Sequence, residues 1–232
     1  MAKLNSVFHW RYGHLLMLLL LPCAGSADSS RAEMDWENYW PSDETDAIFD
    51  SINDGELTFL DGPPENKVHH HHNKLIIQQD SLQSGWVGLQ QCHEHLDVFR
   101  QVQIVYRESR IRKLRIREFS NIGTAQVEGH TVQLTDVKPG ASICLEAESK
   151  VLTKQKDGSY VLKNGPFMRK FFDGYFPMRV TLDVKLPPEL TFTGIDPPQQ
   201  KGFEVVENNH HLHLDAWFEG KLVTRIQLKN VN

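Results

Sequence analysis

Alternating apolar and polar residues recur along this 232-residue chain from residue 73 onward, and they constrain its fold more than any other feature. Val180, Leu182 and Val184, for example, alternate with charged and polar residues, which in a strand places them on one face. Such runs, bounded by turn-forming residues, predict strands at 75–78, 86–90, 98–106, 114–119, 125–128, 132–134, 142–147, 160–162, 178–186, 190–193, 203–206, 211–218 and 223–228.

This pattern predicts an all-β fold. Strands with one apolar and one polar face are typical of antiparallel sheets, and the sequence has no long run with the 3.6-residue period of a helix. About a dozen short strands in one region indicate a sandwich or a barrel. We therefore predict an antiparallel β-sandwich domain over residues 73–232, with a division into two small β subdomains near 150–175 as the alternative.

The last fifty residues refine this prediction. The segment from Val180 to Leu190, followed by Asp196, Pro197, Pro198 and two further strands, resembles the C-terminal half of the immunoglobulin-like sandwiches of exported proteins. The resemblance covers about a fifth of the chain and implies an immunoglobulin-like fold, without implying a function.

Residues 1–27 have the three parts of a secretory signal peptide. Lys3 and Arg11 give a positive start, residues 15–21 are an unbroken apolar run, and small residues follow Pro22. The run is shorter than the roughly 18–20 residues that a membrane-spanning helix requires. We expect the mature protein to be extracytoplasmic, periplasmic or secreted, with no transmembrane segment.

The chain has three cysteines. Cys23 directly follows the apolar run and is an alternative lipid-attachment site, which Pro22 disfavours because lipoprotein signals resemble each other in having Gly, Ala or Ser there. Removal of the signal leaves Cys92 and Cys144, and an even pair in an oxidising compartment favours a disulfide. Two buried thiols or thiolate metal ligands are the alternatives.

An acidic leader and a linker separate the signal from the predicted sandwich. Residues 28–56 carry ten carboxylates against one base, Arg31, together with several aromatic residues, so we expect this segment to be partly ordered. Residues 61–72 are a linker rich in Pro and Gly that ends in four consecutive histidines. The net charge of −5 argues against a nucleic-acid-binding protein.

The histidines are the candidate metal ligands. His93 and His95 share a face if they lie in a strand, as do His211 and His213, and two such pairs on neighbouring strands predict a site for Cu or Zn. Residues 69–72 offer a flexible ligand arm and His130 a further ligand. Binding requires neutral imidazoles, so affinity should fall below about pH 6. The alternative is that these histidines are ordinary polar residues on a solvated strand face.

A segment dense in aromatic residues, 164–177, is a candidate partner-binding surface. Its proposed contact residues are Phe167, Arg169, Phe171, Phe172 and Tyr175. The alternative, which we favour from the sequence, is a plug that closes one end of the core.

The stretch 100–117 is basic and carries seven Arg and Lys residues. It predicts either an anion-binding hairpin, a surface covered by the acidic leader, or a solvated strand face, of which the last is the default. The sequence contains no Gly-x-Ser-x-Gly, His-Glu-x-x-His, phosphate-binding glycine loop or Cys-x-x-Cys motif.

Together these features predict an exported, non-enzymatic binding or accessory factor of a bacterial envelope, with a metal ion or an unknown envelope protein as its partner. An interaction module that uses residues 164–177 is the second hypothesis. A hydrolase with an unrecognised carboxylate site is the third.

Overall fold

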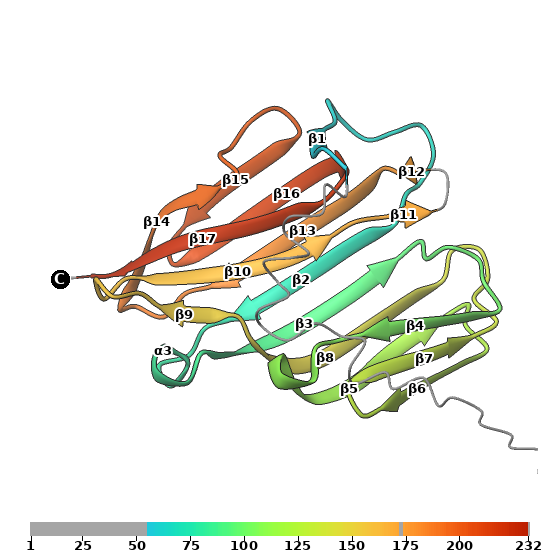
Figure 1. Cartoon of the computed structure of the whole chain (residues 1–232), viewed down its shortest axis with the longest axis horizontal. Helices are drawn as coiled ribbons and strands as arrows, with labels where there is room; N and C mark the ends of the chain where they lie inside the picture. Colours follow the sequence, from blue (N-terminus) through green and yellow to red (C-terminus); the bar gives the residue numbers. More distant parts are fainter. Residues whose placement is uncertain (1–54, 172–173, 232) are drawn as a thin grey trace, which may run out of the picture. The chain divides into compact units, whose positions relative to one another are not determined.

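The computed structural model describes residues 55–171 and 174–231, and this part of the chain is almost entirely β (Figure 1). The expected signal peptide and most of the acidic leader lie outside these residues. The strands are β1 (Thr58–Phe59), β2 (His70–Ile76), β3 (Trp86–Glu94), β4 (Gln101–Val105), β5 (Ile111–Ser120), β6 (Thr124–Glu128), β7 (Thr131–Thr135), β8 (Ser142–Lys150), β9 (Leu152–Lys154), β10 (Tyr160–Phe167), β11 (Lys170–Phe171), β12 (Gly174–Tyr175), β13 (Met178–Lys185), β14 (Leu190–Asp196), β15 (Phe203–Asn208), β16 (His211–Glu219) and β17 (Leu222–Asn230).

Helical structure is confined to α3 (Ser81–Ser84) and the 3-10 turn η1 (Glu108–Arg110) within the described residues. Across that same part of the chain, no helix has the length and apolar character needed to cross a membrane.

The largest sheet has eight strands, in the order β1-β16-β13-β2-β3-β8-β5, with β15 also paired to β16. All of its pairings are antiparallel except one, because β2 runs parallel to β13. The purely antiparallel arrangement expected from the alternation is therefore wrong at this position. The alternation of residues within one strand does not show whether its neighbour runs parallel or antiparallel to it. The strands β2 and β13 are far enough apart in sequence for the crossover that parallel pairing requires.

Two smaller sheets cover one face of the large sheet. The four-stranded sheet β14-β17-β10-β9 closes the first apolar core, in which Leu75 and Leu182 of the large sheet are buried together with Ile226. The three-stranded sheet β4-β7-β6 closes the second core, where Ile143 of β8 is buried with Val132 of β7. The arrangement is consistent with the predicted β-sandwich, and the buried alternation of β13 is confirmed.

A polar strip lies between the two cores on the covered face of the large sheet. Two neighbouring rows of residues cross this face from β13 through β2 and β3 to β8. In each row, a polar residue of β2 and one of β3 lie between apolar residues of β13 and β8. The rows are Leu182-Asn73-Gln91-Leu145 and Val180-His71-His93-Ile143. Asn73, Gln91 and His93 are buried. Buried polar groups are costly unless they are hydrogen-bonded, so this strip needs its own bonding network.

The opposite face of the sheet carries the disulfide. Cys92 of β3 and Cys144 of β8 are direct partners in the register, with an S–S distance of 2.12 Å, so the predicted disulfide is confirmed. Cys92 follows the strand alternation and points away from the side of His93. Both features remove Cys92 from the candidate metal ligands.

The basic stretch finds its partners within the sheet. Arg112 and Lys113 of β5 each lie 2.6 Å from carboxylate oxygens of Glu148 on β8. Arg115 lies 2.9 Å from Glu146 on the same strand. Carboxylates of β8 therefore neutralise several charges of the basic stretch by cross-strand pairing. One of the sequence-based alternatives assigns this role to the acidic leader.

Candidate metal centre

The run of four histidines alternates between the two faces of the sheet. His70, His71 and His72 lie in β2, where successive side chains point to opposite faces, and the carbonyl of His69 extends the ladder by accepting the N–H of Arg179 at 3.0 Å. His71 pairs directly with His93 of β3, on the covered face. The segment expected to be a flexible arm is thus strand for most of its length.

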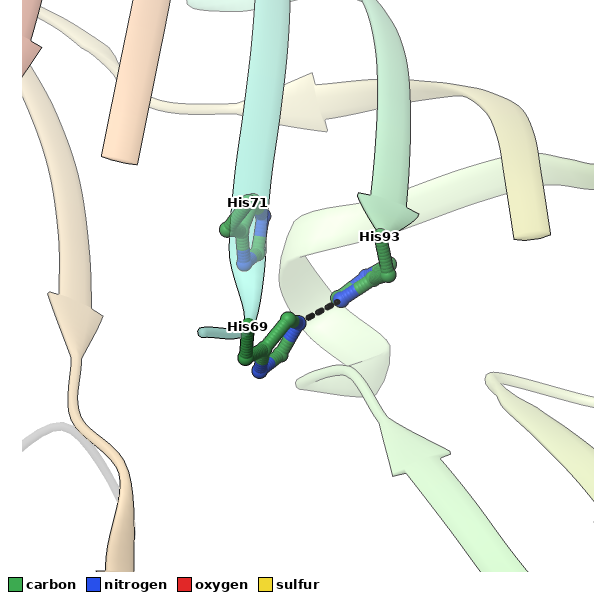
Figure 2. Close-up of side chains that lie close together, drawn as sticks. All are labelled: His69, His71 and His93. Atoms are coloured by element: carbon green, nitrogen blue, oxygen red, sulfur yellow. Dashed lines mark hydrogen bonds between the residues drawn. The ribbon is translucent and has the colours of Figure 1, made fainter. Parts of the chain in front are cut away.

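Three of these imidazoles form a cluster. His69, His71 and His93 each offer one ligand nitrogen, and the three nitrogens lie within 4.8 Å of one another. Figure 2 shows His69 and His93 turned toward each other, with His71 beside them. These three residues, named the His triad below, are the one group of this kind among residues 55–171 and 174–231.

The spacing suits a metal ion. His69 Nε2 lies 3.2 Å from His93 Nδ1, and the ring centroids of His71 and His93 are 4.3 Å apart. Two nitrogens that bind one tetrahedral Zn²⁺ at about 2.0–2.1 Å lie about 3.3–3.4 Å apart. The pair of nitrogens from His69 and His93 is therefore already at the spacing of two zinc ligands, and a nitrogen of His71 lies within 4.8 Å of both.

Amide side chains orient two of the imidazoles. His93 Nε2 lies 3.1 Å from Gln91 Oε1, and His71 Nε2 lies 3.0 Å from Asn73 Oδ1. An amide oxygen only accepts hydrogen bonds, so each Nε2 carries the proton and donates it. The Nδ1 atoms of His71 and His93 are then unprotonated, as metal ligation requires. His93 Nδ1 accepts a hydrogen bond from His69 Nε2 at 3.2 Å, so the proton of His69 must move to its other ring nitrogen when an ion binds.

The amide orientations are themselves fixed by a chain of hydrogen bonds. Gln91 Nε2 donates to Asn73 Oδ1 at 3.0 Å, and Asn73 Nδ2 donates to Asn164 Oδ1 at 3.0 Å. Tyr106 donates its hydroxyl proton to Gln91 Oε1. Burial raises the pKa of Tyr106, so it remains a donor at any physiological pH. The network ends at Asn164, whose buried Nδ2 has no hydrogen-bond partner within the described part of the chain.

Burial keeps the His triad neutral. It lowers the pKa of His69 to about 4, against the opposing effect of the Asp97 carboxylate, and it lowers the pKa of His71 to about 3. The pKa of His93, which is 6% exposed, falls well below the ordinary value for the same reason. Neutral imidazole is the form that binds metal. Protons should therefore compete only near pH 4, lower than the pH of about 6 expected from unperturbed histidines.

The surroundings of the triad are partly apolar and carry one ion pair. The ring of Phe167 meets His71 edge-on at a centroid distance of 4.7 Å. Near His69, Arg169 donates to both carboxylate oxygens of Asp97, at 2.6 and 3.1 Å. These two charges act on the pKa of His69 in opposite directions, so the pair leaves little net charge beside the triad.

The four histidines predicted as metal ligands are not brought together. His93 lies in the His triad, whereas His95 follows the end of β3 with a left-handed φ of 54°. His211 and His213 lie on β16, and β13 and β2 stand between β16 and β3. The sequence pattern places the two pairs on neighbouring strands, whereas in the sheet both β13 and β2 separate them.

The sequence had assigned residues 69–72 only an auxiliary role, so it missed His69 and His71 as members of a formed cluster. The signal that would have found them is the same alternation used for the other strands. In an extended run of histidines, every second ring faces the same side.

The aromatic segment divides between the core and the surface. Phe167 is 6% exposed and belongs to the first core, so it is not a surface contact residue. Arg169 pairs with Asp97, and Tyr175 is half-buried with the ammonium of Lys170 5.2 Å from its ring centroid. The side chain of Phe171 and the whole of Phe172 lie outside what the structure describes. The buried position of Phe167 agrees with the sequence-based alternative in which this segment closes one end of the core.

The described residues therefore offer three neutral, hydrogen-bond-oriented imidazoles around one point, a donor set suited to Cu or Zn. Comparisons of the chain with protein-family models, with curated proteins and with solved structures find no match.

Proposed function

We propose that this protein binds a transition-metal ion, Cu or Zn, through Nε2 of His69 and Nδ1 of His71 and His93. The observation that carries the proposal is the combination of close spacing and oriented rings. One nitrogen of each of the three histidines lies within 4.8 Å of the other two, and Asn73 and Gln91 accept the Nε2 protons of His71 and His93, which leaves the Nδ1 lone pairs of these two rings for the ion. Such outer partners are a regular feature of histidine metal sites.

The proposed setting is extracytoplasmic. The N-terminal signal pattern favours export, and the disulfide between Cys92 and Cys144 is compatible with an oxidising compartment. We propose a binding or accessory role in a bacterial envelope, in keeping with a sequence that carries none of the catalytic motifs considered above.

Metal titration tests the proposal. Calorimetry with Zn²⁺ and, separately, with Cu²⁺, each against a competing chelator, should detect one high-affinity equivalent in the purified protein. His69→Ala should weaken this equivalent at least tenfold, because it removes one of three ligands. His69 is the suitable position, since it is partly exposed and its loss opens no hole in either core.

His130→Ala serves as the matched control, because His130 is also partly exposed and lies outside the triad. It should bind like the unmodified protein. Equal affinity of the unmodified protein and His69→Ala, or no high-affinity equivalent for either ion, would refute the proposal.

A further inference from the structure

We infer a second metal site on the opposite face of β2, formed by Asp183, His72, His211 and His213. All three imidazoles meet the one carboxylate. His72 Nε2 lies 2.8 Å from Asp183 Oδ2, and His213 Nδ1 lies 2.8 Å from Asp183 Oδ1. His211 Nε2 lies 3.4 Å from the same Oδ1.

Three adjacent strands bring these residues together. In the sheet order, β2 and β16 flank β13, which carries Asp183, and the three strands lie side by side in Figure 1. Asp183 is the direct register partner of His213, while His211 and His72 are diagonal neighbours of the carboxylate. His211 and His213 are two residues apart in one strand, so their side chains share a face.

The donor set has the chemistry of a metal site. Three imidazoles and one carboxylate suit Zn, Ni or Cu. Burial acts to raise the pKa of Asp183, but hydrogen bonds from His213 and His72 outweigh it and hold this pKa below its ordinary value, so the carboxylate is charged. The rings of His72, His213 and His211 are 39%, 41% and 48% exposed, which leaves them accessible to an ion and free to turn.

Binding requires a rearrangement, because the ligand atoms of this group, unlike those of the His triad, do not yet lie within 4.8 Å of one another in any set of three. In the metal-free state the imidazoles of His72 and His213 donate N–H bonds to the carboxylate. A cation that enters beside Asp183 takes the lone pair of the facing nitrogen once its proton has moved, through solvent, to the other ring nitrogen. Nitrogen and oxygen ligands of one tetrahedral ion lie about 3.3–3.4 Å apart, so the contacts of 2.8 Å lengthen by about half an ångström. This site is assembled by its carboxylate, and both imidazoles that donate to Asp183 must change tautomer, whereas in the His triad only His69 must do so.

The two sites are independent of each other. The side chains of His72 and His71 point to opposite faces of β2, and none of the four residues of the second site belongs to the His triad. We therefore expect a second equivalent of metal, bound more weakly than the first because more of its imidazoles must change tautomer, because its ligand atoms lie farther apart, and because its rings are more exposed.

Titration of the whole protein with Zn²⁺ alone, and with Ni²⁺ alone, tests this inference. The unmodified protein should bind two equivalents, and the double variant His211→Ala/His213→Ala should lose the weaker one, with at least tenfold lower affinity. Asp183→Asn, which keeps the size of the side chain but removes its charge, should have the same effect. His210→Ala is the matched control, because His210 is exposed, adjacent in sequence and directed to the carbonyl of Leu190.

Imidazole ¹⁵N spectra give a readout that a loss of folding would not imitate. Addition of Zn²⁺ should shift the signals of His72, His211 and His213 after those of the His triad have saturated. The inference is overturned if the double variant binds as many equivalents as the unmodified protein, or if His210→Ala loses the second equivalent equally. In the His69→Ala protein the weaker equivalent should persist, so failure of the triad and failure of this site are distinguishable.

Discussion

Two amide side chains decide which nitrogen atoms of the His triad are available to an ion. Gln91 and Asn73 accept the Nε2 protons of His93 and His71, and the hydrogen bonds from Tyr106 and to Asn164 hold both amides in the one orientation that permits this. Without these acceptors, each imidazole could place its proton on either nitrogen, and a proton on Nδ1 would block the nitrogen proposed to bind the ion.

Gln91→Ala should therefore weaken binding at the His triad by about 10–100-fold, the usual effect of removing an outer-shell partner. Competition with a chromogenic chelator measures the change. Gln90→Ala is the control: Gln90 is the preceding residue of β3, so its side chain points to the opposite face, and its variant should bind normally. Equal affinities for the two variants would mean that Gln91 does not orient His93.

The depressed histidine pKa values also predict a pH dependence of folding. In the unfolded chain these histidines titrate near 6.5, whereas in the folded protein the pKa of His69 is about 4 and that of His71 is about 3. The unfolded state thus binds more protons below pH 6.5, so the free energy of unfolding is fully retained above that pH and falls as the pH drops toward 4. Each unit of pKa depression corresponds to about 1.4 kcal/mol.

Urea unfolding of the metal-free protein between pH 7.5 and pH 4.5 measures this loss. His69→Gln removes one of the depressed groups and should show a shallower fall in the free energy of unfolding. An identical slope for the variant and the unmodified protein would contradict the assignment of the effect to His69.

At the scale of single elements, β2 has the central position. It lies between β13 and β3, and its histidines contribute alternately to the covered face, at His71, and to the outer face, at His72. One strand therefore supplies ligands to both proposed metal sites, and the four-histidine run is explained by the period of a strand rather than by a flexible arm.

The disulfide acts on the neighbouring pair of strands. It joins β3 and β8 across 52 residues of sequence, and the chain-entropy argument gives about 2–4 kcal/mol for a cross-link of this kind. Cys92→Ala/Cys144→Ala should lower the free energy of unfolding in urea by that amount. Metal binding at the His triad should be unchanged, since the cysteines lie on the other face of β3. An unchanged urea midpoint would show that the cross-link contributes little.

At the scale of the described domain, two apolar cores share one sheet. The polar strip separates them along β2 and β3, yet the hydrogen-bonded ladder continues through the strip from β13 to β8. Because the same sheet closes both cores, we expect them to unfold together.

Leu162→Ala in the first core and Leu134→Ala in the second should each cost about 2–5 kcal/mol, the usual range for a buried leucine. Native-state hydrogen exchange should give similar opening free energies for amides of β17 and β7, and either variant should lower both. Selective loss of protection in β7 alone would instead indicate two separately unfolding units.

Much of the local structure could be predicted from the sequence. The alternation at Val180, Leu182 and Val184 identified a strand and its buried face, and the pair Cys92 and Cys144 was correctly expected to be a disulfide. The identity of the neighbouring strand could not be predicted from the same pattern, because the alternation repeats every two residues whichever strand lies alongside.

The amino-acid pattern alone predicts that the described chain is built from β-strands, which residues share a strand face, and where histidines are concentrated. It does not predict that β2 enters the large sheet beside β3, which sets His71 against His93, and beside β13, which sets His72 near Asp183. The face of a residue follows from local backbone geometry, whereas the order of the strands depends on long-range hydrogen bonding and on the burial of both cores at once.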